Sequence, residues 1–157
     1  ANQGVYVSPT IQTGYRGRER LLRKQDITPL SVEEELRLDA AKAKCESQLE
    51  FVGKMWQDWG VKIIAGTDAI QMFGDYSLGL ELHSDAGMSN MDVIKSATGE
   101  AAKGLGMIDQ IGTLEVGKEA DLIVVENDPL KDIKAMREIQ LVIRAGREIL
   151  PYKTNER

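Results

Sequence analysis

The fold is decided by residues 61–69, which read Val-Lys-Ile-Ile-Ala-Gly-Thr-Asp-Ala. The stretch begins with a short apolar run rich in β-branched residues, a pattern typical of a buried strand. It then breaks at Gly66 and ends on a carboxylate, Asp68. A carboxylate at the end of a buried strand costs desolvation free energy unless a partner stabilises it. The carboxyl ends of parallel strands are also where α/β barrels place their active sites. Asp68 is therefore the first candidate for a functional residue.

The chain before this strand predicts a βαβ unit. Residues 4–10 indicate a first strand closed by Pro9. Ser31 and Glu34 have the spacing of a capping box, and Gly60 is placed to end the helix that follows. The apolar or small residues of this helix recur every three or four positions, and we expect one face of it to be buried: Leu38, Ala41, Cys45, Leu49, Phe51, Val52, Trp56 and Trp59. A strand, a long helix and a strand with tight junctions imply parallel strands covered by helices.

Residues 13–24 are rich in glycine and arginine and allow two interpretations. They could form a mobile active-site loop whose arginines meet a substrate carboxylate or phosphate. They could also form a solvated loop that leads into a short helix, which we favour. Tyr15 and Arg16 are the candidate substrate-binding residues of this segment. Cys45 lies on the apolar stripe of the long helix, so we expect a buried structural thiol rather than a nucleophile.

After Asp68 we expect a loop at 69–77 and a helix over 78–83 that runs to Gly87. Ser89 predicts the cap of another helix, which breaks near residues 98–99 before a short helix over 100–105. From Met107 the pattern changes to short β segments. We expect a short strand within 111–118, a strand over 120–126 and a hairpin over 139–149 that turns at Ala145-Gly146. The boundary between the two regions is placed near Met107.

Composition excludes several classes of function. The 157 residues carry 25 acidic and 20 basic side chains, and a net charge of −5 gives no general attraction to nucleic acid or to anionic lipid. A single cysteine allows neither an internal disulfide nor a thiolate zinc site. No apolar run reaches the roughly 20 residues of a membrane span. No signal-like segment opens the chain, and it starts within a strand. We therefore expect a cytoplasmic piece of a longer protein.

Several motifs, taken in order, resemble the C-terminal part of metal-dependent amidohydrolases, in particular the imidazolonepropionase- and Xaa-Pro dipeptidase-like branch. These motifs are residues 64–69, 86–89, 97–106 and the Gly-Lys-Glu-Ala-Asp-Leu-Ile-Val run of residues 117–124. The resemblance implies an α/β fold. Residues 1–107 would form the last two strands and helices of a (β/α)8 TIM-like barrel, with its seventh strand at 5–8 and its eighth at 61–65. Residues 108–157 would form the C-terminal share of a small β-sandwich.

The resemblance also implies an activity, the hydrolysis of C–N bonds (amide, cyclic amide or dipeptide) by a metal-activated water. Asp68 would be a metal ligand and the general base, and the cofactor would be a divalent metal, zinc above all. The family's histidine ligands are missing here, because His83 is the single histidine and is expected to be a surface or half-buried residue of a helix. A catalytic zinc ion needs three protein ligands. We therefore expect the isolated chain to bind no catalytic metal and to be inactive.

Asp121 and Lys118 are interpreted as structural, Asp121 holding a turn through backbone hydrogen bonds and Lys118 being solvated. The expected partners are a small-molecule or dipeptide substrate and either a second copy of the chain or a missing N-terminal part. Neither nucleic acid nor a membrane is expected. Two alternatives stay open. The chain could be a non-catalytic module that self-associates through unpaired sheet edges, or a complete α/β binding domain whose resemblance is accidental.

Overall fold

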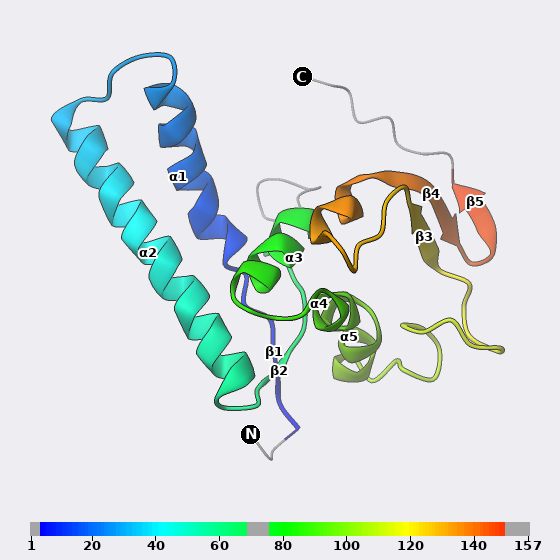
Figure 1. The fold of residues 1–157 in the computed structure, drawn as a ribbon. Coiled ribbons are helices and arrows are strands. Elements are labelled where there is room, and N and C mark those ends of the chain that lie inside the picture. Colours follow the sequence, from blue (N-terminus) through cyan, green and yellow to red (C-terminus); the bar gives the residue numbers. More distant parts are fainter. Residues whose placement is uncertain (1–3, 69–75, 150–157) are drawn as a thin grey trace.

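The computed structural model describes residues 4–68 and 76–149. Figure 1 shows a long helical hairpin on one side, two short strands and three helices in the middle, and a small sheet on the other side. The predicted loop at 69–77 falls largely outside the described residues. The elements follow in the order β1 (Tyr6–Val7), α1 (Gln12–Gln25), α2 (Val32–Gln57), β2 (Lys62–Ile63), α3 (Tyr76–Asp85), α4 (Asn90–Ala97), α5 (Gly99–Gly104), β3 (Leu122–Val125), the 3₁₀ helix η1 (Ile133–Arg137), β4 (Ile139–Arg144) and β5 (Arg147–Ile149).

The first two strands, β1 and β2, pair in parallel, which confirms the predicted strand direction. Tyr6 lies opposite Lys62 and Val7 opposite Ile63. Each strand has two residues, fewer than the sequence patterns predicted. Because both strands run in the same direction, their carboxyl ends meet at one edge.

Helix α1 corrects the expectation of a loop over residues 13–24. It has 14 residues, and its arginines, leucines and lysine are all good helix formers. Of the two glycines that made the segment look irregular, Gly14 allows close packing of the helices. A Cβ atom on Gly14 would lie 2.9 Å from Gln48 Oε1 of α2, so the missing side chain lets the two helices approach. This use of glycine leaves no separate mark in the sequence.

Helix α2 begins and ends as predicted. Ser31 accepts a hydrogen bond from the amide of Glu34, and the Glu34 carboxylate accepts one from the amide of Ser31, which completes the capping box. At the other end Gly60 adopts φ +59°, in the left-handed region that favours glycine. The expectation of burial is wrong for Phe51 and Trp59, which are 53% and 51% exposed and pack edge to face against each other on the surface.

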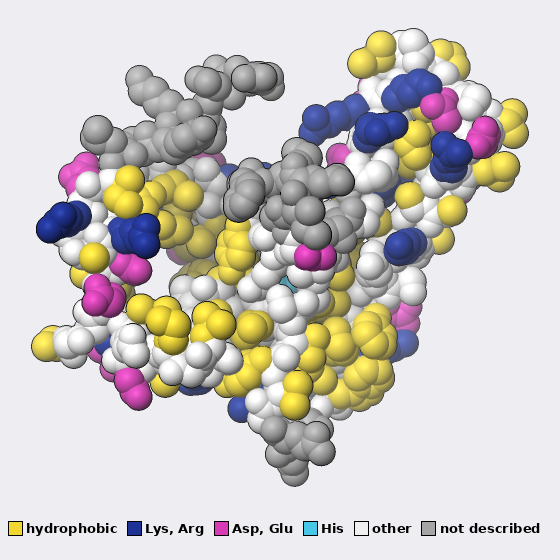
Figure 2. Space-filling model, turned by 180° about the vertical axis from the view of Figure 1, so that it is seen from behind, with side chains coloured by type: hydrophobic (Ala, Val, Ile, Leu, Met, Phe, Trp, Pro, Cys, Tyr) yellow, Lys and Arg dark blue, Asp and Glu magenta, His cyan; other side chains and the backbone are white. Residues whose placement is uncertain are grey.

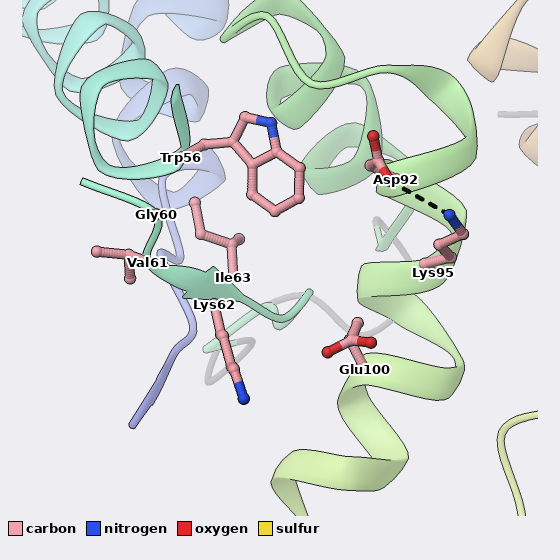
Figure 3. A pocket seen from close by; sticks show the side chains of 8 residues that line it. All are labelled: Trp56, Gly60, Val61, Lys62, Ile63, Asp92, Lys95 and Glu100. Carbon is pink, nitrogen blue, oxygen red and sulfur yellow. Dashed lines mark hydrogen bonds and ion pairs between the residues drawn. The ribbon is translucent and has the colours of Figure 1, made fainter. Parts of the chain in front are cut away.

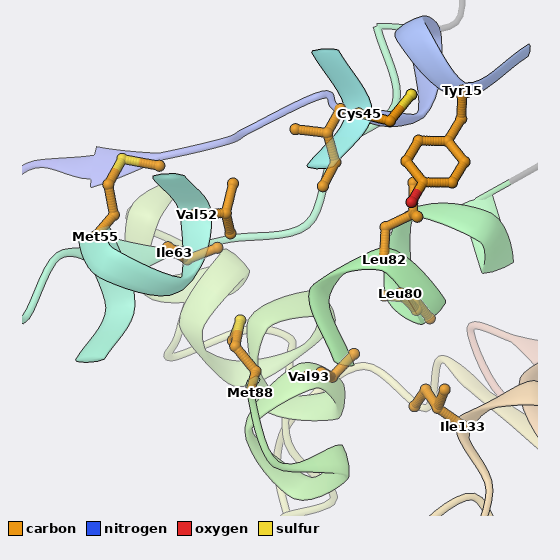
Figure 4. Close-up of a cluster of buried hydrophobic side chains, with 11 residues drawn as sticks. Tyr15, Cys45, Val52, Met55, Ile63, Leu80, Leu82, Met88, Val93 and Ile133 are labelled. Atoms are coloured by element: carbon orange, nitrogen blue, oxygen red, sulfur yellow. The ribbon is translucent and has the colours of Figure 1, made fainter. Parts of the chain in front are cut away.

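The hydrophobic core lies where the hairpin, β2 and helices α3 and α4 meet (Figure 4). Val52 of α2 lies beside Ile63 of β2, Cys45 lies toward Tyr15 of α1, and Leu80 of α3 and Val93 of α4 belong to the same cluster. Cys45 is buried as expected, and burial raises the pKa of its thiol. Each of these side chains removes apolar surface from water, which contributes roughly 1.5–3 kcal/mol for a fully buried aliphatic side chain.

The C-terminal region forms an antiparallel sheet of order β3-β4-β5, as its strand patterns predicted. Ala145 and Gly146 form the turn between β4 and β5, both with positive φ. The Asp121 carboxylate accepts a hydrogen bond of 2.7 Å from the Ala145 amide, so the structural interpretation of Asp121 is confirmed. Ile133 of η1 packs in the main core, which attaches the sheet to α3. The domain boundary near Met107 stays a prediction.

Two expectations for residues 111–118 are wrong. The segment contains turns instead of a short strand. Lys118, expected to be solvated, has a side chain that is 11% exposed and donates to Thr113 Oγ1 and to the Glu115 carboxylate. These local side-chain bonds stabilise turns at the expense of a strand ladder.

The surface carries hydrophobic side chains over the small sheet, seen at the left of Figure 2, whereas the hairpin at the upper right mixes basic, acidic and apolar groups. Ile123 and Val124 are adjacent in β3 and so point to opposite faces of the sheet, yet they are 42% and 44% exposed. Both faces of this sheet therefore contact solvent in part. Among the described helices, none combines the length and the apolar character that a membrane crossing requires.

Candidate active site

The chain that leads from β2 to Asp68 is held by hydrogen bonds from three different elements. The amide of Ile64 donates to the Val7 carbonyl of β1, and the amide of Ala65 donates to the Ser96 carbonyl of α4, both at 2.9 Å. The carbonyl of Gly66 then accepts a bond of 2.8 Å from Gln12 Nε2 of α1. Consecutive residues of this segment are therefore fixed to a strand and to two helices.

Asp68 lies at the end of this segment, at the edge where both parallel strands finish. Its side chain is exposed, and its backbone has φ 45°, in the left-handed region. Aspartate tolerates this region better than most residues, yet the conformation still costs on the order of 1 kcal/mol. Strained residues held by surrounding contacts are concentrated at functional sites. The strand β2 ends at Ile63, so Asp68 lies five residues beyond it, on the segment that follows the strand. The catalytic role of Asp68 stays a prediction.

Two buried polar side chains, which the sequence analysis did not single out for this edge, lie behind it. Gln12 is 3% exposed and His83 of α3 is 1% exposed, so the expectation of a surface or half-buried His83 is wrong. Gln12 Oε1 and both ring nitrogens of His83 have no hydrogen-bond partner among the described residues. Gln12 lies just before the segment 13–24 that was interpreted as a loop, and a lone histidine near apolar residues gives no signal of its depth.

The charge state of His83 follows from its surroundings. Burial lowers the pKa of the imidazole below its ordinary value, and the nearby Pro9 carbonyl, which follows β1, opposes this shift to a smaller extent. The ring therefore lies close to the chain that follows β1. A neutral, buried imidazole is the form that this environment favours.

The two candidate substrate-binding residues are on α1. Tyr15 is buried in the core, where its ring lies beside Leu82 (Figure 4) and the Arg18 guanidinium stacks 4.2 Å from the ring centre. Burial raises the pKa of the Tyr15 hydroxyl. Arg16 is half-buried on the same helix. The substrate role of Tyr15 and Arg16 stays a prediction.

A cavity of about 380 Å³ lies along β2. Gly60, Val61 and Lys62 line one wall, and Asp92, Lys95 and Glu100 line the other (Figure 3). Asp92 pairs with Lys95 at 3.5 Å. Both residues of β2 line the cavity, together with the two residues before the strand, and Asp68 is not part of its lining. In α/β barrels the active sites lie at the carboxyl ends of the strands, so we do not assign the reaction to this cavity.

The described residues do not fit a complete metal site. A catalytic zinc ion takes three protein ligands and a water. Within the two described ranges, no group of three or more histidine, cysteine, aspartate or glutamate side chains is close enough to share an ion. Asp68 offers one carboxylate, and His83 is buried beneath the edge. The described part of the chain therefore does not hold a catalytic metal by itself.

Comparison with known proteins shows the family to which the chain belongs. The family model described as "Amidohydrolase family" matches residues 1–149. The chain belongs to the amidohydrolase family. Members of this family are generally metal-dependent hydrolases. The family resemblance predicted from the sequence motifs is thereby confirmed.

The relatives of this amidohydrolase-family chain include several hydrolases. It is 38% identical over 85 residues to ochratoxinase from Aspergillus niger, an alignment that covers 53% of this chain and 18% of the relative. It is 40% identical over 73 residues to imidazolonepropionase from Brucella anthropi, covering 45% and 16%. Among solved structures, it matches an Xaa-Pro dipeptidase with methionine bound in the active site, with 33% identity and a TM-score of 0.73 over 93% of this chain and 34% of that structure.

The alignments thus span less than a fifth of these two relatives and about a third of the solved dipeptidase. The structural neighbours are amidohydrolases of the TIM-barrel type, and the described elements form a mixed helix and sheet arrangement that agrees with this class.

Proposed function

We propose that this chain is the C-terminal part of a hydrolase that cleaves C–N bonds in small amides, cyclic amides or dipeptides. The proposal rests on family membership and on one structural observation. Asp68, which follows the second parallel strand, is exposed in a left-handed backbone conformation, and three neighbouring elements hold the segment just before it. The named relatives, an ochratoxinase, an imidazolonepropionase and an Xaa-Pro dipeptidase, indicate the range of substrates to test.

In this proposal β1 and β2 are the seventh and eighth strands of a (β/α)8 barrel, and the sheet β3-β4-β5 is the C-terminal share of a β-sandwich. The parallel pairing of β1 with β2 and the partly exposed faces of the small sheet support that assignment. The sequence of β3, Leu-Ile-Val-Val, is continuously apolar. Such sequences are typical of strands that are covered on both faces.

Asp68 would act as proton acceptor for the attacking water and as one ligand of a divalent metal, zinc in the first instance. A carboxylate near a cation stays ionised and can accept a proton. The remaining metal ligands would lie outside the described residues. The proposed partners are a small-molecule or dipeptide substrate and further copies of the protein, and the proposed location is the cytoplasm.

The proposal is tested on the longest natural polypeptide that contains this segment, loaded with zinc. An Xaa-Pro dipeptide, an N-acyl amino acid and a cyclic amide are incubated with it, and release of the amine product is measured. We expect turnover of at least one class, loss of turnover on dialysis against a chelator and recovery with zinc ions. Absence of hydrolysis in all three classes by folded, zinc-loaded protein would contradict the proposal.

A second candidate function is self-association without catalysis. It is supported by the partial exposure of Ile123 and Val124, which lie on opposite faces of the small sheet. Apolar sheet faces and unpaired edges recruit further strands. Sedimentation equilibrium of the 157-residue chain distinguishes this case, since a concentration-independent monomer would exclude it.

A further inference from the structure

The side chain of Gln12 joins two parts of the chain that are 54 residues apart. Gln12 is in the first turn of α1, directly after β1, and its Nε2 donates to the Gly66 carbonyl at 2.8 Å. Gly66 is two residues before Asp68. Since a carbonyl oxygen can only accept, the amide nitrogen must be the atom that faces it, which fixes the orientation of the Gln12 amide.

This hydrogen bond is the last of three that hold the segment leading to Asp68. Ile64 and Ala65 are fixed through their own amides, by Val7 and Ser96. Gly66 is fixed through its carbonyl oxygen, which accepts a hydrogen bond from a side chain and not from the backbone. Within the described residues, Gln12 is thus the side chain that donates to the peptide after Gly66. A substitution there can release this peptide and leave the two preceding backbone bonds in place.

The surroundings of Gln12 keep its side chain in one position. A Cβ atom on Gly79 of α3 would meet the Gln12 amide atoms at 3.5 Å, which is ordinary van der Waals contact. His83 is one helical turn after Gly79 and is buried on the same helix. Gln12 is 3% exposed, and its Oε1 atom has no partner within the part of the chain that the structure describes. Burying an amide oxygen without a partner is costly, so this arrangement calls for a compensating role.

We propose that Gln12 is a positioning residue, which holds the Gly66 peptide so that Asp68 keeps the orientation in which it serves the reaction. The inference rests on the proposed function of Asp68. Gln12 does not touch the substrate in this scheme, and it acts through the backbone of residues 66–68. Catalytic groups displaced by even 1 Å lose much of their effect. The substitution of Gln12 should therefore lower turnover more than it lowers substrate binding.

The experiment compares Gln12→Met with Gly79→Ala in the longest natural polypeptide that contains this segment. Methionine keeps the length of the side chain and removes the donor. Alanine at position 79 fits the 3.5 Å space beside Gln12 and is the matched control. For Gln12→Met we expect kcat per folded molecule to fall about tenfold or more, as loss of one hydrogen bond that acts in the transition state implies, with KM changed less than threefold. Gly79→Ala should keep both constants.

A readout independent of activity accompanies the kinetics. Amide hydrogen exchange of residues 64–68 is followed by mass spectrometry or NMR. We expect faster exchange in this segment for Gln12→Met and unchanged exchange for Gly79→Ala. Unchanged exchange in Gln12→Met would overturn the proposal even if no substrate had been found, because Gln12 would then not be what holds residues 64–68.

A double variant separates this proposal from the proposed function itself. If Gln12 acts through Asp68, then Gln12→Met should cause no further loss in an Asp68→Asn background. Full kcat in Gln12→Met beside an inactive Asp68→Asn would overturn the positioning role and leave the function of Asp68 intact. A fully active Asp68→Asn would overturn both. A lower melting temperature in Gln12→Met with unchanged kcat per folded molecule would show a merely structural residue and would also overturn the proposal.

Discussion

The packing of α2 against α3 predicts that one substitution, glycine to alanine, has opposite effects in two helices. A Cβ atom on Gly53 of α2 would lie 2.6 Å from the backbone carbonyl oxygen of Ala86, whereas one on Gly17 of α1 would meet nothing within 4 Å. Both positions are inside helices, where alanine is more favourable than glycine by about 0.8–1.0 kcal/mol. Gly17→Ala should therefore stabilise the protein by roughly that amount.

Gly53→Ala gains the same helix propensity but must displace the backbone near Ala86. Overpacking of this kind costs about 1–3 kcal/mol. Since the propensity gain cancels between the two variants, Gly53→Ala should be about 1–3 kcal/mol less stable than Gly17→Ala. Urea denaturation followed by tryptophan fluorescence gives both values, because Trp56 packs against the core. Equal stabilisation by the two variants would refute the packing of α2 on α3.

Two further predictions concern buried and turn-forming polar groups. Because burial lowers the pKa of His83, the unfolded chain binds the proton more readily than the folded chain. The free energy of unfolding should therefore be full above about pH 6.5 and fall at lower pH by at most about 1.4 kcal/mol per pH unit. Urea midpoints between pH 5 and 8 should fall less in His83→Gln than in the parent, and parallel curves would argue against a buried neutral ring. Asp121→Ala should lower the free energy of unfolding by about 1 kcal/mol, because the hydrogen bond from the Ala145 amide is lost. Asp121→Asn keeps an acceptor and should leave the stability nearly unchanged. Equal losses of stability in thermal melts of the two variants would contradict this prediction.

Features that depend on local chemistry could be predicted from the sequence. The capping box of Ser31 and Glu34, the left-handed Gly60 and the turn at Ala145-Gly146 each need nothing beyond neighbouring residues, and each is observed. The parallel direction of β1 and β2 followed from the helical connection between them. That Asp68 follows a strand could be predicted from the apolar run before it, although the strand ends earlier than expected, at Ile63.

Features that depend on distant partners could not be predicted. Gly14 looked like a loop residue, but its function is to let α1 approach Gln48. The depth of His83 comes from the packing of α3 over the β1–α1 connection, and Gln12 gains its partner from a residue 54 positions away. Trp59 fits the apolar spacing of α2, yet it comes after the last turn of the helix and so leaves the buried face.

The most direct test of the proposed active site is the turnover of Asp68→Asn beside Asp121→Asn, in the zinc-loaded polypeptide that contains this segment. Asparagine tolerates the left-handed backbone at position 68, so the substitution removes the charge and leaves the turn in place. Asp121 holds a turn of the small sheet and serves as the matched control. We expect kcat to fall by about 10²–10⁴-fold in Asp68→Asn and to be unchanged in Asp121→Asn. An Asp68→Asn enzyme with the kcat of the parent would contradict the account.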